Sequence, residues 1–165
     1  MTACGVLLFS LVTVLSCLSC GAAGEEEIHL LPRGFVGPVL IIFNQPDGEP
    51  REYKDGKRVY RIPSSGVLRT QFPTPPSGVV PAHFHYALND SLVAELRELI
   101  GSEAASADTG LYVFEGEIGG VSRSPPDPHL DYLSYVVGHV ADRDSLARQA
   151  RRLLDRETRD RKNPE

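Results

Sequence analysis

The sequence predicts a mainly β fold, a single β-sandwich-like domain with prealbumin-like or immunoglobulin-like architecture, followed by a C-terminal amphipathic α-helix. The length of 165 residues is enough for one domain. Nine of the 13 prolines lie between residues 32 and 81, a density that is incompatible with long helices. Short apolar runs alternate with Gly-, Pro- and Asp-containing turns, which is the pattern of an all-β domain.

The first two strands are predicted on either side of a turn. Residues 28–31 form a short apolar strand, and Pro32-Arg33-Gly34 forms the turn that follows it. Residues 39–43 read Val-Leu-Ile-Ile-Phe without interruption, so we expect a central strand that is covered on both faces.

Two Asp-Gly pairs predict hairpins, because Gly accepts the positive φ that tight hairpin turns require. Asp47-Gly48 and Asp55-Gly56 flank the polar segment 50–54, which is expected to be an edge strand. Residues 58–62 follow as a half-buried strand with Tyr60 and Ile62 pointing inward. After a turn at Pro63 to Gly66, residues 67–72 form the next strand.

The second half of the domain is less regular. Residues 79–87 predict a strand. The segment 90–100 is ambiguous, because Asn89-Asp90 fits a hairpin turn while the helical spacing of Leu92, Val93, Leu96, Leu99 and Ile100 favours a helix capped by Asp90. We further expect loops at 101–109 and 116–130 and buried strands at 111–114 and 132–140.

The C-terminal segment 142–165 differs from the domain 28–141 in both pattern and charge. Leu146, Ala150, Leu153 and Leu154 have helical spacing, which predicts an amphipathic helix on the domain. This segment has a net charge of +2, whereas residues 25–141 have a net charge of −7. The total of −5 argues against a general nucleic-acid binder.

The N-terminal residues 1–20 resemble a signal peptide, with an uncharged apolar stretch that is too short to span a bilayer. Val14-Leu15-Ser16-Cys17 resembles a bacterial lipobox, so Cys17 is the predicted lipid attachment site, with Cys20 as the alternative. Cleavage of the signal peptide near Ala23, without lipid attachment, would instead release a secreted protein. A third possibility is that the N-terminal segment is not cleaved and itself anchors the protein. Residues 21–27 are expected to be an acidic linker.

These features predict a bacterial cell-envelope protein that is held on the membrane by an N-terminal lipid, with secretion as the alternative. An envelope protein or a small ligand is the expected partner. A further hypothesis is that the protein carries a small apolar ligand inside the sandwich.

Several motifs in residues 28–72 resemble a family of small bacterial envelope proteins known as domain of unknown function 6843. They are the start Leu31-Pro32-Arg33-Gly34-Phe35, the turn Asn44-Gln45-Pro46-Asp47-Gly48, and the run from Tyr53 through Asp55-Gly56, Arg58, Tyr60, Pro63 and Gly66 to Gln71-Phe72. Ser134 to Gly138 matches a late strand of that family. The resemblance implies an envelope location, an all-β fold and a strand rather than a helix near 90–100, and it implies no reaction. We expect its motif residues Asn44, Asp55, Gly56, Arg58, Tyr60, Pro63 and Gly66 to act as scaffolding.

The sequence contains few residue patterns that indicate catalysis. His83 and His85 lie two apart on one strand face, and Asp127, His129 or Asp131 could add a third metal ligand, yet surface histidines are the favoured interpretation. We interpret Glu115 and Glu117 as charged residues at the edge of the domain surface rather than as a catalytic pair of carboxylates. We therefore expect no cofactor, no metal and a non-catalytic binding or structural domain. The alternative is a metal-dependent or hydrolytic enzyme that uses His83, His85 and the loop 116–131.

Overall fold

The computed structural model describes residues 24–76, 81–88, 91–99, 109–121 and 129–160. The predicted lipidation sites Cys17 and Cys20, and the predicted loop 101–109 up to residue 108, lie outside the described residues. Within the described residues, no helix is long and apolar enough to span a bilayer.

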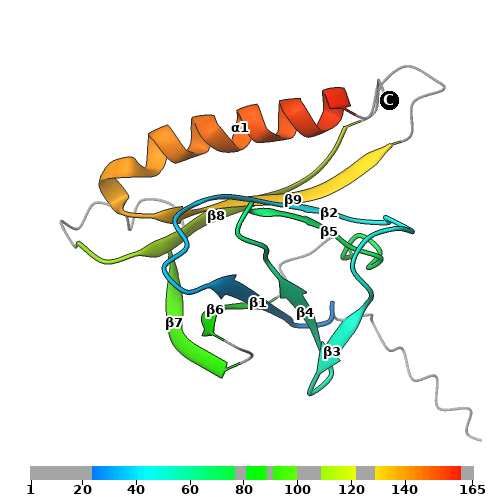
Figure 1. The fold of residues 1–165 in the computed structure, drawn as a ribbon, viewed down its shortest axis with the longest axis horizontal. Coiled ribbons are helices and arrows are strands. Elements are labelled where there is room, and N and C mark those ends of the chain that lie inside the picture. Colours follow the sequence, from blue (N-terminus) through cyan, green and yellow to red (C-terminus); the bar gives the residue numbers. More distant parts are fainter. Residues whose placement is uncertain (1–23, 77–80, 89–90, 100–108, 122–128, 161–165) are drawn as a thin grey trace, which may run out of the picture.

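In the part of the chain that the structure describes, nine strands form one mixed sheet, and a C-terminal helix covers part of it (Figure 1). The strands are β1 (Glu27–Pro32), β2 (Gly37–Ile42), β3 (Glu52–Lys54), β4 (Lys57–Arg61), β5 (Val67–Arg69), β6 (Ala82–Leu88), β7 (Ser91–Leu99), β8 (Tyr112–Val121) and β9 (Leu130–Gly138). The short 3₁₀ turn η2 (Val140–Asp142) leads into α1 (Arg143–Asp160).

The sheet has the strand order β3-β4-β1-β6-β7-β8-β9-β2-β5 and curls on itself at β7. The start of β7 pairs antiparallel with β6, and its last three residues, Arg97 to Leu99, pair parallel with β8. We call β3-β4-β1-β6 the first half-sheet and β8-β9-β2-β5 the second half-sheet. The two lie one above the other in Figure 1, with α1 over the outer face of the second. The predicted mainly β fold with a C-terminal helix is therefore confirmed.

The core lies between the half-sheets because apolar residues alternate along the strands. Its buried members come from both halves, among them Leu31, Tyr60 and Phe84 from the first and Ile41 and Tyr135 from the second. These side chains pack against one another between the two half-sheets.

The apolar run in β2 is covered on both faces, as predicted. Val39 and Ile41 point into the core between the half-sheets, whereas Leu40 and Ile42 point toward α1. The helix buries Leu153 against Leu40 and Ile42. Since β2 is apolar at every position in this stretch, burial on only one side would leave large apolar side chains in water.

The two Asp-Gly pairs behave differently. Asp55 and Gly56, with φ values of 52° and 76°, form the predicted two-residue hairpin turn between β3 and β4. Asp47-Gly48 also forms a turn, but β2 and β3 lie at opposite parts of the sheet, so the predicted hairpin there is wrong. The chain instead crosses between the half-sheets at this point.

The helix that periodicity favours at 90–100 is also wrong, because residues 91–99 form β7. Pairing with β6 on one side and β8 on the other outweighs the local pattern. Two of the residues assigned to the apolar helix face, Leu92 and Val93, are about half exposed, at 48% and 47%.

The long loop expected at 116–130 is shorter than predicted, because β8 continues to Val121 and β9 begins at Leu130. At the glycines that suggested a loop, a side chain from β9 or from His129 just before it lies close to the backbone. A Cβ at Gly119 would lie 2.7 Å from the hydroxyl of Tyr132. Glycine therefore serves close cross-strand packing in β8 rather than chain flexibility.

Candidate functional site: a groove on the outer face

The strand period of two divides the first half-sheet into an inner and an outer face. In β1, Glu27 and His29 are buried in the interior, whereas Ile28 and Leu30 line the outer face. In β6, Phe84 points into the core, while the two predicted histidines line the outer face. The expectation that they share one strand face agrees with this placement.

A groove of about 310 Å³ crosses this outer face. Its floor is apolar and comes from β1 and β4, and its walls are charged or polar and come mainly from β3, β4 and β6. The lining residues are Ile28, Leu30, Glu52, Lys54, Asp55, Lys57, Val59, Arg61, His83, His85 and Leu92. This volume is at the lower end of the range for small-molecule and side-chain pockets, about 300–1,000 Å³.

Most of the charged wall residues are paired. Arg61 donates from Nε and Nη2 to the two carboxylate oxygens of Glu52 at 2.7 and 2.8 Å. The carboxylate of Glu26 contacts Lys57 Nζ and lies 3.5 Å from His83 Nε2. The hydrogen bond and the charge of Lys57 lower the pKa of Glu26.

Three lining residues differ from these. Within the described part of the chain, none of Lys54, Asp55 and His85 makes a side-chain hydrogen bond or an ion pair. Lys54 is on β3 and His85 is on β6, and Asp55 lies in the turn after β3. Among the described residues, the groove thus offers one cation, one carboxylate and one imidazole without a partner.

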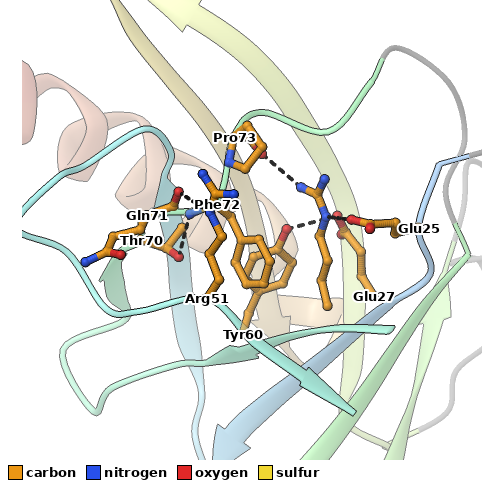
Figure 2. Close-up of polar contacts among 9 residues, drawn as sticks. Glu25, Glu27, Arg51, Tyr60, Thr70, Gln71, Phe72 and Pro73 are labelled. Atoms are coloured by element: carbon orange, nitrogen blue, oxygen red, sulfur yellow. Dashed lines mark hydrogen bonds and ion pairs between the residues drawn. The ribbon is translucent and has the colours of Figure 1, made fainter. Parts of the chain in front are cut away.

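A buried polar cluster lies on the inner side of the same half-sheet (Figure 2). Tyr60 donates its hydroxyl hydrogen to Glu27 Oε1 at 3.1 Å. His29 lies between Glu27 Oε2, 3.3 Å from Nε2, and the Tyr135 hydroxyl, 3.1 Å from Nδ1. Burial, with the nearby charge of Glu27, raises the pKa of both tyrosines. Glu27 is 5% exposed and His29 is 0% exposed.

Arg58 provides the positive charge of this cluster. Its Nε donates to Glu25 Oε2 at 2.6 Å, its Nη1 donates to the Pro73 carbonyl at 2.8 Å, and its guanidinium lies over the Phe72 ring. Burial alone would lower the pKa of Arg58, but the hydrogen bonds with Glu25 and Tyr60 outweigh it and raise that pKa.

The structure corrects the prediction of an acidic linker at residues 21–27 at the C-terminal end of that segment. Glu27 belongs to β1, and Glu25 and Glu26 are ion-paired to β4 residues instead of standing free. The chain is therefore fixed to the fold from Glu25 onward.

The other predicted ligands do not reach the groove. His129 lies 2.9 Å from Asp131 Oδ1 at the start of β9 and does not line the groove. Asp127 lies outside the described residues. In the described ranges, no group of three or more His, Cys, Asp or Glu residues is placed to hold a metal ion.

Glu117 accepts a hydrogen bond from the Tyr132 hydroxyl at 3.3 Å, and this contact lies under α1, away from the two histidines. The side chain of Glu115 lies outside the described residues.

The predicted scaffold residues lie at turns or in the core. Asn44 has a φ of 57° and its amide donates to Thr74 and Asp131. The Gly66 amide donates to the Pro63 carbonyl, and a Cβ at Gly66, where φ is 77°, would collide with the Pro38 carbonyl. Only glycine fits that corner without moving the backbone.

Sequence reasoning missed Lys54 and the buried pair Glu27 and His29. One signal could have found the pair: with Leu31, they occupy the inward positions of a strand at a period of two. The groove had no such signal, because its lining comes from five separate strands.

Comparison with known proteins adds a family and a fold. Residues 23–103 match the model described as "Family of unknown function (DUF6843)". No curated protein matches the chain. A crystal structure of a "Putative Lipoprotein" from Bacillus anthracis is similar, with a TM-score of 0.50 and 13% sequence identity. That similarity covers 69% of this chain and 70% of the Bacillus anthracis chain, and it bears on the fold alone. The resemblance found in the sequence is thus confirmed by the match of residues 23–103 to this family of unknown function.

Proposed function

We propose that this chain is a cell-envelope protein, lipid-anchored at Cys17, whose β domain is a non-catalytic binding module with the outer-face groove as its binding surface. The observation that carries the proposal is the groove itself, in which an apolar floor is combined with Lys54, Asp55 and His85, three side chains that have no hydrogen-bond or ion-pair partner among the described residues. The lipobox-like residues Val14 to Cys17 support the anchor. The description of the structurally similar Bacillus anthracis protein fits the same location.

The placement of acid and base groups supports binding over catalysis. Glu27 and His29 would be the natural acid–base pair, but both side chains are buried between the half-sheets and no substrate could touch them. The accessible carboxylates Glu26 and Glu52 are already occupied by Lys57 and Arg61. Paired surface charges of this kind suit recognition and orientation of a partner.

The anchor would hold the groove near the membrane. Cys17 precedes Glu25, the first residue fixed to the fold, by eight residues, which extend at most about 28 Å. A partner would therefore have to reach the domain close to the lipid surface.

We expect Cys17→Ser to abolish incorporation of radiolabelled palmitate and to shift the protein from the membrane fraction to the soluble fraction of the producing cells. The thiol of Cys17 accepts the lipid, and this cysteine becomes the N-terminal residue once the signal peptide is removed. A serine hydroxyl cannot replace the thiol. Cys20→Ser serves as the matched control and should keep full labelling. Labelling that persists in Cys17→Ser and disappears in Cys20→Ser would move the site, and labelling in neither parent nor variant would refute the anchor.

The binding surface can be tested by site-specific photo-crosslinking in cells. A photoreactive residue at Leu92, which lines the groove and is 48% exposed, should give a discrete crosslinked adduct. The same residue at Val36, which is 50% exposed and does not line the groove, should not. The two positions are matched in exposure, so equal adducts from both, or none from Leu92, would count against the groove.

A further inference from the structure

The exposed side of α1 is basic. It carries five arginines, which we call the arginine face: Arg148, Arg151, Arg152, Arg156 and Arg159. Among the described residues, none of the five has a hydrogen-bond or ion-pair partner. The exposed carboxylates described on the helix are those of Asp144 and Asp155, so five positive charges stand against two negative ones. A third carboxylate, that of Glu157, is largely buried and pairs with Arg69 of β5.

The rest of the domain has the opposite charge. Residues 25–141 have a net charge of −7. The apolar side of α1 is not available to a partner, because Leu146 and Leu153 are buried against the second half-sheet. Only the arginine face of the helix meets solvent. A negatively charged surface is therefore attracted to this side of the domain more strongly than to the others.

The proposed anchor brings a lipid surface within reach of α1. The eight-residue linker from Cys17 to Glu25 extends at most about 28 Å. Stacked sheets lie about 10 Å apart, and a helix with its side chains is about 10–12 Å thick. The outer surface of α1 thus lies about 20–25 Å from the first half-sheet, to which Glu25 is fixed by its ion pair with Arg58. The linker is long enough for α1 to lie on the membrane that holds Cys17.

The shape of the arginine face fits an extended anionic surface. Arg148 and Arg159 lie about 17 Å apart along the helix axis, since each residue adds about 1.5 Å. A membrane that contains anionic lipids presents phosphate groups over the whole of this length, and a guanidinium group donates to phosphate through two parallel N–H bonds. Because the apolar side of α1 is packed on the sheet, the contact is electrostatic and does not insert the helix.

Resting on the proposed anchor, we infer that the arginine face of α1 lies on the anionic lipid surface of the membrane that holds the protein. The lipid phosphates accept hydrogen bonds from the guanidinium groups, and the helix stays packed on β2 and β9. The groove lies on the outer face of the first half-sheet and α1 on the outer face of the second, which are opposite sides of the fold (Figure 1). In this orientation the groove points away from the membrane, toward a partner in the aqueous phase.

The test measures which side of the anchored domain contacts lipid. The chain contains no tryptophan, so an introduced one is a single reporter. Ser145→Trp places it at an exposed position of α1, three and seven residues before Arg148 and Arg152 and therefore on the same side of the helix. Tyr53→Trp places it on β3, where the tyrosine is 50% exposed. The lipidated protein from the producing cells is reconstituted in phosphatidylcholine vesicles, with or without phosphatidylglycerol, that contain a lipid with a spin-labelled, quenching headgroup.

We expect phosphatidylglycerol to increase the quenching of Ser145→Trp at least twofold and to leave that of Tyr53→Trp unchanged or lower. The increase should disappear at about 1 M salt, where charges are screened beyond about 3 Å. Equal quenching of Ser145→Trp in the two kinds of vesicle, or an increase that persists at this salt concentration, would overturn the inference.

Charge reversals in the Ser145→Trp protein test the arginine face directly. Arg152→Glu should at least halve the increase, and Arg148→Glu combined with Arg152→Glu should abolish it. Arg33→Glu is the matched control, because Arg33 is exposed in the turn after β1 and has no partner among the described residues. It changes the net charge by the same amount as Arg152→Glu and should keep the increase. Equal losses from Arg33→Glu and Arg152→Glu would mean that only net charge matters, and the inference would fail.

Flotation of the same vesicles separates a failure of this inference from a failure of the proposed function. Protein that does not float with pure phosphatidylcholine vesicles has no anchor, which refutes both the anchor and the orientation that rests on it. Protein that floats with both kinds of vesicle but shows no increase in quenching refutes the orientation alone.

Discussion

Replacing Arg58 with alanine is expected to lower the free energy of unfolding by about 2–3 kcal/mol, the upper part of the range for losing the hydrogen bonds of a charged group. The residue is 6% exposed, and its guanidinium donates to Glu25 and to the Pro73 carbonyl. Without it, the Pro73 carbonyl loses its donor and the Phe72 ring loses its covering cation.

The measurement is chemical denaturation at neutral pH, with Arg61→Ala as the matched control. Arg61 lies two residues further along the same strand and also pairs with a glutamate, but both side chains of that pair are exposed, at 48% and 42%. Its loss should cost about 0–1 kcal/mol. Arg58→Lys should lie in between, because lysine keeps the charge but cannot contact Glu25 and Pro73 with one planar group. Equal effects of Arg58→Ala and Arg61→Ala would contradict the role of the buried cluster.

The second large effect is a loss of stability at alkaline pH. Burial raises the pKa of Tyr60 and of Tyr135 above 10, the ordinary value. Between that value and the raised pKa, the unfolded chain releases protons that the folded chain retains. The stability that these two phenols contribute is therefore fully present below pH 10 and is lost as the pH rises above it. Each group should cost about 1.4 kcal/mol per pH unit, so the two together cost about 2.7.

Denaturation curves collected from pH 8 to pH 11.5 test this expectation. The free energy of unfolding should begin to fall near pH 10, and Tyr135→Phe should make the decline less steep by the share of one phenol, about 1.4 kcal/mol per pH unit. Tyr86 and Tyr132, whose pKa values burial also raises, contribute to the slope that remains. That variant also removes the contact with His29 and lowers stability at neutral pH, but this loss does not change the slope. A decline of the same steepness in the wild type and in Tyr135→Phe would show that this phenol ionises freely.

Much of the fold could be predicted from local sequence because several segments have only one stable solution. The apolar run at 39–43 needs cover on both faces, which requires a central strand, and the structure places it between the core and α1. Asp55-Gly56 fixes a tight hairpin because both residues adopt positive φ. The helical spacing of Leu146 and Leu153 determines which face of α1 is buried.

Local sequence was insufficient where pairing partners decide the conformation. Residues 91–99 have a helical pattern, yet they form β7 because β6 and β8 both offer free edges to them. Residues 116–120 have the composition of a loop, yet Glu117 to Gly120 pair with β9. The glycines let side chains of the neighbouring strand and of His129 lie close to the backbone. In both places the hydrogen bonds to distant strands outweigh a small local preference.

The sequence by itself determined the mainly β class, the C-terminal helix, the family and the outward placement of His83 and His85, since each depends on a short-range pattern. Only the tertiary structure decided that Glu27 and His29 are buried and that Lys54 and His85 line one groove with an apolar floor. These residues are separated by up to 58 positions in the chain. Strand order alone brings them together, because the sheet places β1 between β4 and β6.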